Sequence, residues 1–242
     1  MTRRQQSLGV ALVGLALLGV WGSTLARASA DHAGARAEWS QMSARLLANE
    51  PGYDAQRSDI LYEESDAALA RVRRSAPIAA AGLMLLLVGA TSLLGGRRTP
   101  KMMDGASDFR VLLATVVDAA IVGGGWVGLG WLLYEVEPTP LGTALHAAIP
   151  ILVLTVVASP LSAGASPGQW LMRTRALTRS GTRPYALQTL LASVLVPAAG
   201  LFAFLALLSP PLRHDALVGP HLAAAGLVTH RLRPRFRWGK TR

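Results

Sequence analysis

The sequence contains no cysteine, and charged residues make up only 16% of its 242 residues. The absence of cysteine excludes disulfide bonds, thiolate metal sites and cysteine nucleophiles. Recognisable catalytic signatures are also lacking: there is no HExxH pair, no GxSxG elbow and no Walker-type phosphate loop. We therefore expect neither an enzyme nor a protein that holds a metal or another cofactor.

Acidic residues are scarce as well, 14 against 24 lysines and arginines, which gives a net charge of +10. Apolar residues account for 51% of the chain, and its mean hydropathy is +0.36. The charges fall in groups between apolar runs of about 20 residues, the length that crosses a bilayer as a helix. This pattern predicts an all-α polytopic membrane bundle with five or six hydrophobic spans. Orientation and anionic lipid explain the basic excess, so we expect no nucleic-acid partner.

The first 30 residues allow two interpretations. The apolar run Ser7 to Leu25 follows two arginines and ends near the small residues Ala28 to Ala30. These features are typical of a cleaved signal peptide, and the run is also long enough for a retained signal anchor, which the pattern favours. Both interpretations export residues 31–75, which we expect to form a helical hairpin outside the membrane. That hairpin is interpreted either as a packed connector or as a partner-binding surface.

The remaining spans follow from the apolar runs and their flanking charges. Residues 76–100 form the second span, with Ser75 as its cap and Pro77 in its first turn. Residues 101–230 form a membrane domain, and the basic tail 231–242 belongs in the cytoplasm by charge bias. Because a single crossing by the fifth run would export this tail, the chain must return. Either residues 187–208 are re-entrant around Pro197 to Gly200, or residues 217–228 make a short sixth passage, which the run lengths favour.

Arginines gather on the cytoplasmic side between the fourth and fifth runs. We expect this stretch to form an interfacial helix whose apolar residues, such as Ala176 and Leu177, face lipid. Its cations are interpreted as contacts for anionic headgroups or for a partner protein. They are Arg173, Arg175, Arg179 and Arg183.

Asp118 lies within the apolar run Val111 to Tyr134, and a carboxylate at that depth needs a compensating partner. Arg110 precedes it by eight residues, which separates the two by about 80° around a helix and about 12 Å along it. We therefore expect the partner of Asp118 on another helix: His146, His214 with Asp215, or a water-filled pocket. A shared proton with His146 suits cation or proton movement, whereas a bond to a hydroxyl or backbone group makes Asp118 a fixed clasp.

Three of these polar positions also carry a family resemblance. Arg110, Asp118 and Asp215 match the arginine and two aspartates of the RDD family, and residues 165–175 read Ala-Ser-Pro-Gly-Gln-Trp-Leu-Met-Arg-Thr-Arg. With Gly181 and Pro184, the chain resembles an RDD membrane domain over about residues 105–230. The resemblance implies a membrane domain and transport of an unspecified ligand. The chain departs from the family pattern at Gln169, Thr178 and Ala192.

Two hypotheses for function follow. The first is transport of an ion or small ligand through a site formed by Arg110, Asp118, His146 and Asp215, in a homo-oligomer because the span count is small. The second is a non-transporting membrane scaffold or assembly partner that acts through the exported hairpin and the basic cytoplasmic faces. Both place the protein in a bacterial inner membrane with its termini in the cytoplasm and residues 31–74 outside.

Overall fold

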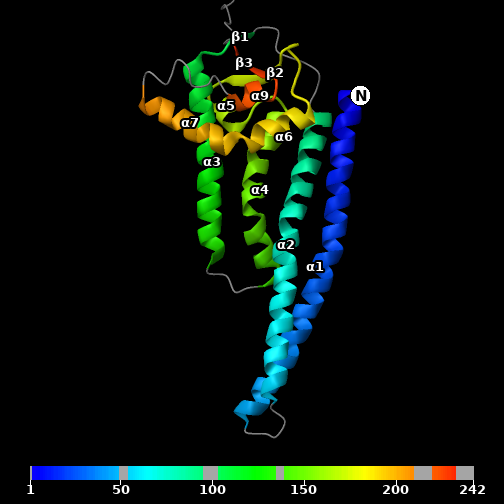
Figure 1. Ribbon diagram of the computed structural model, residues 1–242. Helices are drawn as coiled ribbons and strands as arrows, with labels where there is room; N and C mark the ends of the chain where they lie inside the picture. Colours follow the sequence, from blue (N-terminus) through cyan, green and yellow to red (C-terminus); the bar gives the residue numbers. More distant parts are fainter. Residues whose placement is uncertain (1, 49–53, 95–102, 135–138, 210–219, 233–242) are drawn as a thin grey trace, which may run out of the picture. The chain divides into compact units, whose positions relative to one another are not determined.

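A computed structural model describes residues 2–48, 54–94, 103–134, 139–209 and 220–232. Over these ranges the chain is mostly α-helical and includes one small sheet (Figure 1). The helices are α1 (Arg3–Leu47), α2 (Ala55–Leu94), α3 (Asp108–Tyr134), α4 (Pro140–Ser162), α5 (Pro167–Leu171), α6 (Ala186–Val194), α7 (Val196–Leu208) and α9 (Pro220–Ala224). The strands are β1 (Met103–Gly105), β2 (Thr174–Thr178) and β3 (Leu227–Leu232).

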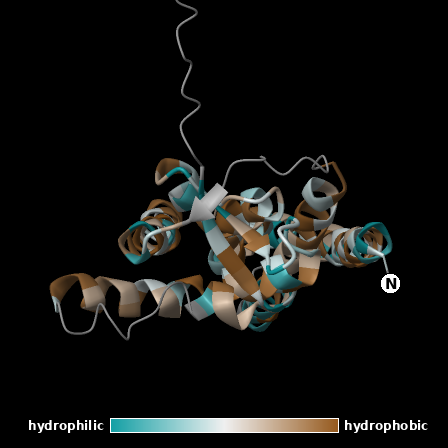
Figure 2. Ribbon diagram, turned by 90° about the horizontal axis from the view of Figure 1, so that it is seen from above, coloured by the Kyte–Doolittle hydropathy of each residue, from teal (hydrophilic) through white to brown (hydrophobic). Residues whose placement is uncertain are grey.

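Four helices, α1 to α4, are long and apolar enough to cross a membrane. The consecutive helices α6 and α7 form a fifth candidate if they count as one span, although they are bent by 54° relative to each other. In the view from above, the helix that extends to the left, α7, is mainly brown, the colour of hydrophobic residues (Figure 2). The helical membrane class expected from the apolar runs is therefore compatible with the fold.

The chain divides into two compact units, and the division passes through the long helices. Unit 1 comprises Met1–Leu12, Met84–Gly125 and Val153–Arg242, and unit 2 comprises Val13–Leu83 and Trp126–Leu152. Within each unit, segments that are distant in sequence pack against one another.

The core of unit 2 is built from small side chains. Buried alanines of α1, α2 and α4 cluster with Val72, and Trp21 packs against this cluster. In α2, Gly82 lies against the Gly14 carbonyl oxygen and Leu17 of α1, where an added Cβ would come within 3.0 Å of both. Small residues of this kind let helix backbones approach closely, which is how helices associate within a membrane. The clustered alanines are Ala28, Ala76, Ala80, Ala144 and Ala148.

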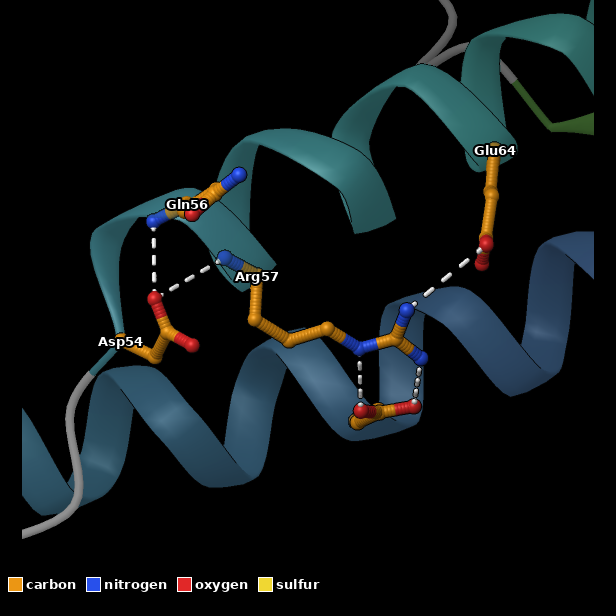
Figure 3. Close-up of polar contacts among 5 residues, drawn as sticks. Asp54, Gln56, Arg57 and Glu64 are labelled. Atoms are coloured by element: carbon orange, nitrogen blue, oxygen red, sulfur yellow. Dashed lines mark hydrogen bonds and ion pairs between the residues drawn. The ribbon is translucent and has the colours of Figure 1, made fainter.

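Polar contacts join α1 and α2 beyond this core. The guanidinium of Arg57 donates to both carboxylate oxygens of Glu38, at 2.9 and 3.0 Å, and lies 3.7 Å from Glu64 (Figure 3). Asp54 accepts hydrogen bonds from the backbone N–H groups of Gln56 and Arg57, so it caps the start of α2 (Figure 3). These bonds join α1 to α2, and the break expected at residues 49–53 lies outside the described residues.

The expected start of a helix at Ser75, with that residue as its cap, is wrong. α2 continues without interruption from Ala55 to Leu94 and carries Pro77 inside it. The Ser75 hydroxyl donates to the carbonyl oxygen of Val72 at 3.2 Å, so it bonds back along the helix instead of capping a new one. Because the hairpin and the second span share one helix, a boundary at residue 75 or 76 has no counterpart in secondary structure.

Unit 1 contains a three-stranded antiparallel sheet in the order β1-β3-β2. Asp104 of β1 and Thr174 of β2 both pair with Arg231 of β3. Gly226, whose φ of +72° suits a residue without a Cβ, turns the chain from α9 into β3. The sheet lies beside the start of α3, because the Ala106 N–H donates to the Thr229 carbonyl at 3.2 Å (Figure 1).

This sheet corrects two expectations about the cytoplasmic stretches. Residues 174–178 form β2 instead of an interfacial helix, and Ala176 and Leu177 are buried in unit 1 instead of facing lipid. The expected sixth passage over residues 217–228 is also wrong where the chain is described, because residues 220–224 form the short helix α9 and residues 227–232 form β3. The described chain is still mostly helical, consistent with the expected all-α class, and it contains this small sheet in addition.

Candidate functional site

Asp118 of α3 is 3% exposed, and both of its carboxylate oxygens accept hydrogen bonds from the turn that opens α5. The Gly168 N–H donates to Oδ1 at 2.7 Å, and the Ser166 hydroxyl donates to Oδ2. Hydrogen bonds to an acidic side chain compensate much of the cost of removing it from water. Asp118 therefore fixes the segment after α4 against the middle of α3. We call this arrangement, in which Gly168 and Ser166 donate to Asp118, the clasp.

The local sequence of the turn prepares these donors. Ser166 caps α5, accepting from the Gln169 N–H at 3.3 Å, while the Gln169 side chain accepts from the Ser166 N–H at 3.2 Å. Pro167 occupies the first turn, where its missing N–H costs nothing. This reciprocal capping box holds the backbone in place, so that the Ser166 hydroxyl and the Gly168 N–H point at the same carboxylate.

Glycine is required at position 168 by contact with α3. An added Cβ there would overlap the backbone carbonyl of Ala114 and lie 3.0 Å from Oδ1 of Asp118. Since backbone atoms of a packed helix cannot move aside cheaply, a larger residue would lift the turn away from Asp118. The bond between the Gly168 N–H and Asp118 thus depends on this close approach.

The structure does not bring the other predicted site residues to Asp118. The Arg110 guanidinium donates to the Met172 carbonyl at 3.3 Å, at the far side of α5 from the clasp. His146 is exposed on the part of α4 that belongs to unit 2. His214 and Asp215 lie outside the described residues. The described partners of Asp118 are instead Ser166 and Gly168, from the cap and first turn of α5.

The four arginines predicted as headgroup contacts separate into different environments. Arg173 and Arg179 are exposed, whereas Arg175 and Arg183 are half-buried. Burial, followed by the like charge of Arg175, lowers the pKa of the Arg183 side chain. Arg3 also interacts unfavourably with Arg183, and buried nitrogens of Arg3 and Arg175 make no hydrogen bond within the described part of unit 1. Arg3, Arg175 and Arg183 therefore form a desolvated cationic cluster.

A second group of arginines lines a cavity of about 410 Å³ in unit 1. Three arginines line it: Arg110 from the start of α3, Arg173 from the turn after α5 and Arg231 from strand β3. Phe109, Leu113, Leu171 and Met172 complete the lining. The lining of this cavity therefore combines positively charged and apolar side chains.

In unit 2, a separate groove of about 200 Å³ lies between α1 and α2. The hydroxyl of Ser65 and the Nδ1 atom of His32 are 2.9 Å apart there and share a hydrogen bond. Trp39 and Tyr62 line the groove and are 40% and 71% exposed. Exposed aromatic side chains beside mixed charges are typical of protein-binding surfaces. The charged residues of the lining are Arg36, Asp66 and Arg73.

Comparisons with protein-family models, curated proteins and solved structures each give no match to this chain.

Sequence reasoning identified Asp118 but missed its partners. Ser166 and Gly168 were treated as members of a turn, although Ser166 followed by Gln169 three residues later is the sequence pattern of a capping box. That pattern places a set of directed N–H and hydroxyl donors at a helix start. Arg231 and Phe109 gave no comparable signal, because only the pairing of β3 with β1 and β2 brings Arg231 towards the start of α3.

Proposed function

We propose that this protein is a non-transporting membrane scaffold of the RDD type, acting through its hairpin and its basic cytoplasmic faces. The observation that carries the proposal is the bonding of Asp118. Its two carboxylate oxygens accept from Gly168 and Ser166, and its side chain is 3% exposed. A group that carries an ion or proton has to exchange partners, whereas a clasp keeps them. The geometry of Asp118 suits the clasp.

The same proposal places the protein in the inner membrane of a bacterium with no enzymatic role. The N-terminus lies in the cytoplasm, α1 leads outward, residues 31–74 lie outside, and α2 returns. Strand β3 supports a cytoplasmic position for the end of the chain, because it pairs with β1 just before α3 and with β2 just after α4. We infer that the bent pair α6 and α7 enters the membrane and returns on the same side.

Two kinds of partner fit these surfaces. Anionic headgroups suit the arginines on the cytoplasmic side, because lipid of the inner leaflet attracts juxtamembrane cations. The hairpin suits a protein partner, either another membrane component or a second copy of the chain. Support comes from Trp39 and Tyr62, whose exposed rings line the groove between α1 and α2.

Ion flux through reconstituted vesicles separates the scaffold from a transporter. Vesicles containing the wild-type protein should pass monovalent cations and protons no faster than protein-free vesicles. The Asp118→Asn variant provides the matched control, since it removes the ionisable group while keeping a side-chain oxygen that accepts. Cation or proton flux that is present in the wild type and lost in Asp118→Asn would overturn the scaffold role.

The topology and the partner surface can be tested in the intact membrane. The chain has no native cysteine, so single substitutions Asp59→Cys and Ser180→Cys report position directly. An impermeant thiol reagent should label position 59 from outside and position 180 only after lysis. A photo-crosslinking residue at position 62 should give one discrete protein adduct, and the same residue at Leu132, which is 63% exposed on α3, should give none. Equal protein adducts at both positions would contradict the assignment of the hairpin.

A further inference from the structure

The cavity at the start of α3 is positively charged. Arg110, Arg173 and Arg231 line it, and no acidic residue contributes to its lining where the structure describes the chain. None of the three takes part in an ion pair among the described residues.

Most N–H donors of the arginines that line the cavity have no acceptor among the described residues. Arg110 donates to the Met172 carbonyl at 3.3 Å through one nitrogen, which leaves most of its N–H donors for another acceptor. Arg173 and Arg231 are exposed. Guanidinium groups bind phosphate through paired, nearly parallel hydrogen bonds. Three of them around one cavity form a phosphate-binding arrangement.

The backbone at Arg173 is a second, independent observation. Its φ is +53°, and it is the only non-glycine residue with a positive φ in the described ranges. A side chain with a Cβ disfavours this conformation, and asparagine or glycine would fit it better. Strained residues concentrate where a particular side chain is needed for binding. Arg173 therefore lines the cavity even though its backbone conformation is unfavourable for a residue with a Cβ.

The surroundings point to a lipid instead of a soluble phosphate. Phe109 and Leu171, which line the cavity, are 56% and 57% exposed. Arg110 stands near the start of α3, one of the helices apolar enough to cross a membrane. A phospholipid joins a phosphate to acyl chains, so it pairs with both the cationic and the apolar parts of the lining. Soluble phosphate would leave the apolar part exposed to water.

We propose that this cavity binds the headgroup of one anionic phospholipid. Arg110, Arg173 and Arg231 hold the phosphate, and the acyl chains run along Phe109 and Leu171. The site differs from general attraction of lipid to basic residues, because it requires particular guanidinium groups in one place. It rests on the cytoplasmic orientation proposed above and is independent of the scaffold role.

Native mass spectrometry of the full-length protein in detergent tests the site, with phosphatidylglycerol as the probe and phosphatidylcholine as its neutral comparison. The wild type should retain one phosphatidylglycerol in preference to phosphatidylcholine. Arg173→Asn should lower that retention about tenfold, the loss expected when charge-assisted hydrogen bonds are removed. Asparagine tolerates the positive φ, so the thermal unfolding midpoint should not fall.

Matched variants separate a specific site from diffuse attraction. Arg179→Asn removes the same charge from an exposed position outside the cavity and should leave retention unchanged. Arg231→Lys keeps the charge but loses the planar pair of donors, so retention should fall several-fold. The proposal is overturned if Arg179→Asn weakens retention as much as Arg173→Asn does, or if phosphatidylcholine binds equally well.

Competition by inorganic phosphate shows whether the ligand is a phospholipid or a soluble phosphate. It should displace bound phosphatidylglycerol only weakly, because it gains nothing from Phe109 and Leu171. Full displacement at millimolar phosphate would identify a soluble anion as the ligand and overturn the lipid assignment. The flux and crosslinking results do not depend on this cavity, so failure of the lipid site and failure of the scaffold role are told apart.

Discussion

The two units of this protein use polar residues in opposite ways. Fifteen polar or charged side chains are buried among the described residues, and Thr143 is the only one of them in unit 2. Every ion pair in the described ranges belongs instead to unit 2, between side chains that are 40% to 55% exposed. Unit 1 thus holds nearly all of the buried polar side chains in the described ranges, and unit 2 holds the exposed ion pairs.

This difference indicates which contacts stabilise the fold of each unit. A buried polar group is costly if it loses its partner, so the bonds of unit 1 favour one arrangement over others. Exposed ion pairs contribute little, because water competes for the same groups. Unit 2 therefore depends on the packing of small side chains such as Ala76 and Ala80. Its surface is free to vary or to meet a partner, whereas the clasp of unit 1 is not.

The largest expected effect comes from removing the clasp with Asp118→Ala. The variant leaves the Gly168 N–H and the Ser166 hydroxyl without their buried acceptor and opens a small void. We expect the free energy of unfolding to fall by about 4 kcal/mol. Thermal unfolding in detergent, followed by circular dichroism, measures the loss.

Asp118→Asn is the control for this loss. The amide keeps an oxygen that accepts from Gly168, so the decrease should be less than half of that for alanine. Equal losses for the two variants would indicate that the negative charge itself, and not the hydrogen bonds, holds the turn.

The clasp shows how far sequence reasoning could reach. A carboxylate inside an apolar run requires a partner, and its angular distance from Arg110 places that partner outside α3. Both inferences use distances within one helix. The identity of the partner depends on how segments 48 and 50 residues away fold back, which helical periodicity does not encode. The residues named from sequence were ionisable ones. The described partners are a hydroxyl and a backbone amide, the kinds of group that the clasp interpretation expected without naming residues.

The next effect concerns His221, also in unit 1. This side chain is 5% exposed, and burial lowers its pKa to about 4 from the ordinary 6.5. Between these two values the unfolded chain binds a proton that the folded chain does not, so stability falls as the pH falls. The loss from pH 6.5 to pH 4 should reach about 3 kcal/mol. Unfolding midpoints measured across this window test it.

His221→Gln isolates this contribution from those of other groups. The variant cannot take up the proton, so its stability should change less between pH 6.5 and pH 4 than that of the wild type. The same change in both proteins would mean that His221 becomes accessible to water before unfolding.

The sheet of unit 1 could not be predicted from the pattern of apolar residues in the sequence. The long helices follow from runs of hydrophobic residues, because a span must satisfy its backbone hydrogen bonds internally. The strands have three to six residues and lie among charges, so β2 could be read as part of an interfacial helix. Thr174, Arg175 and Ala176 gain their strand conformation from pairing with β3, more than 50 residues later. Long-range pairing of this kind overrides the local preference of the residues for helix or strand.

Glycine substitutions give a moderate contrast between the units. In unit 1, a Cβ at Gly200 of α7 would overlap the Cβ of Ala119 in α3, so Gly200→Ala should lower stability by about 1–3 kcal/mol. In unit 2, no atom lies within 4 Å of a Cβ at Gly34, so Gly34→Ala should raise stability by about 0.5–1 kcal/mol. Thermal unfolding of both variants measures the two signs. A gain at Gly200 would show that α3 and α7 separate at little cost.

The smallest effect is expected at the ion pair of Arg57 and Glu38 in the hairpin (Figure 3). Arg57→Gln, Glu38→Gln and the double variant form a cycle that isolates the coupling between the two side chains. Because both side chains are largely solvated, the coupling should be close to the error of the measurement and should weaken further with added salt. A salt-insensitive coupling as large as the loss in Asp118→Ala would contradict the contrast between the units. It would mean that unit 2 also relies on fixed polar bonds, and that the exposed charges of the hairpin are not free to meet a partner.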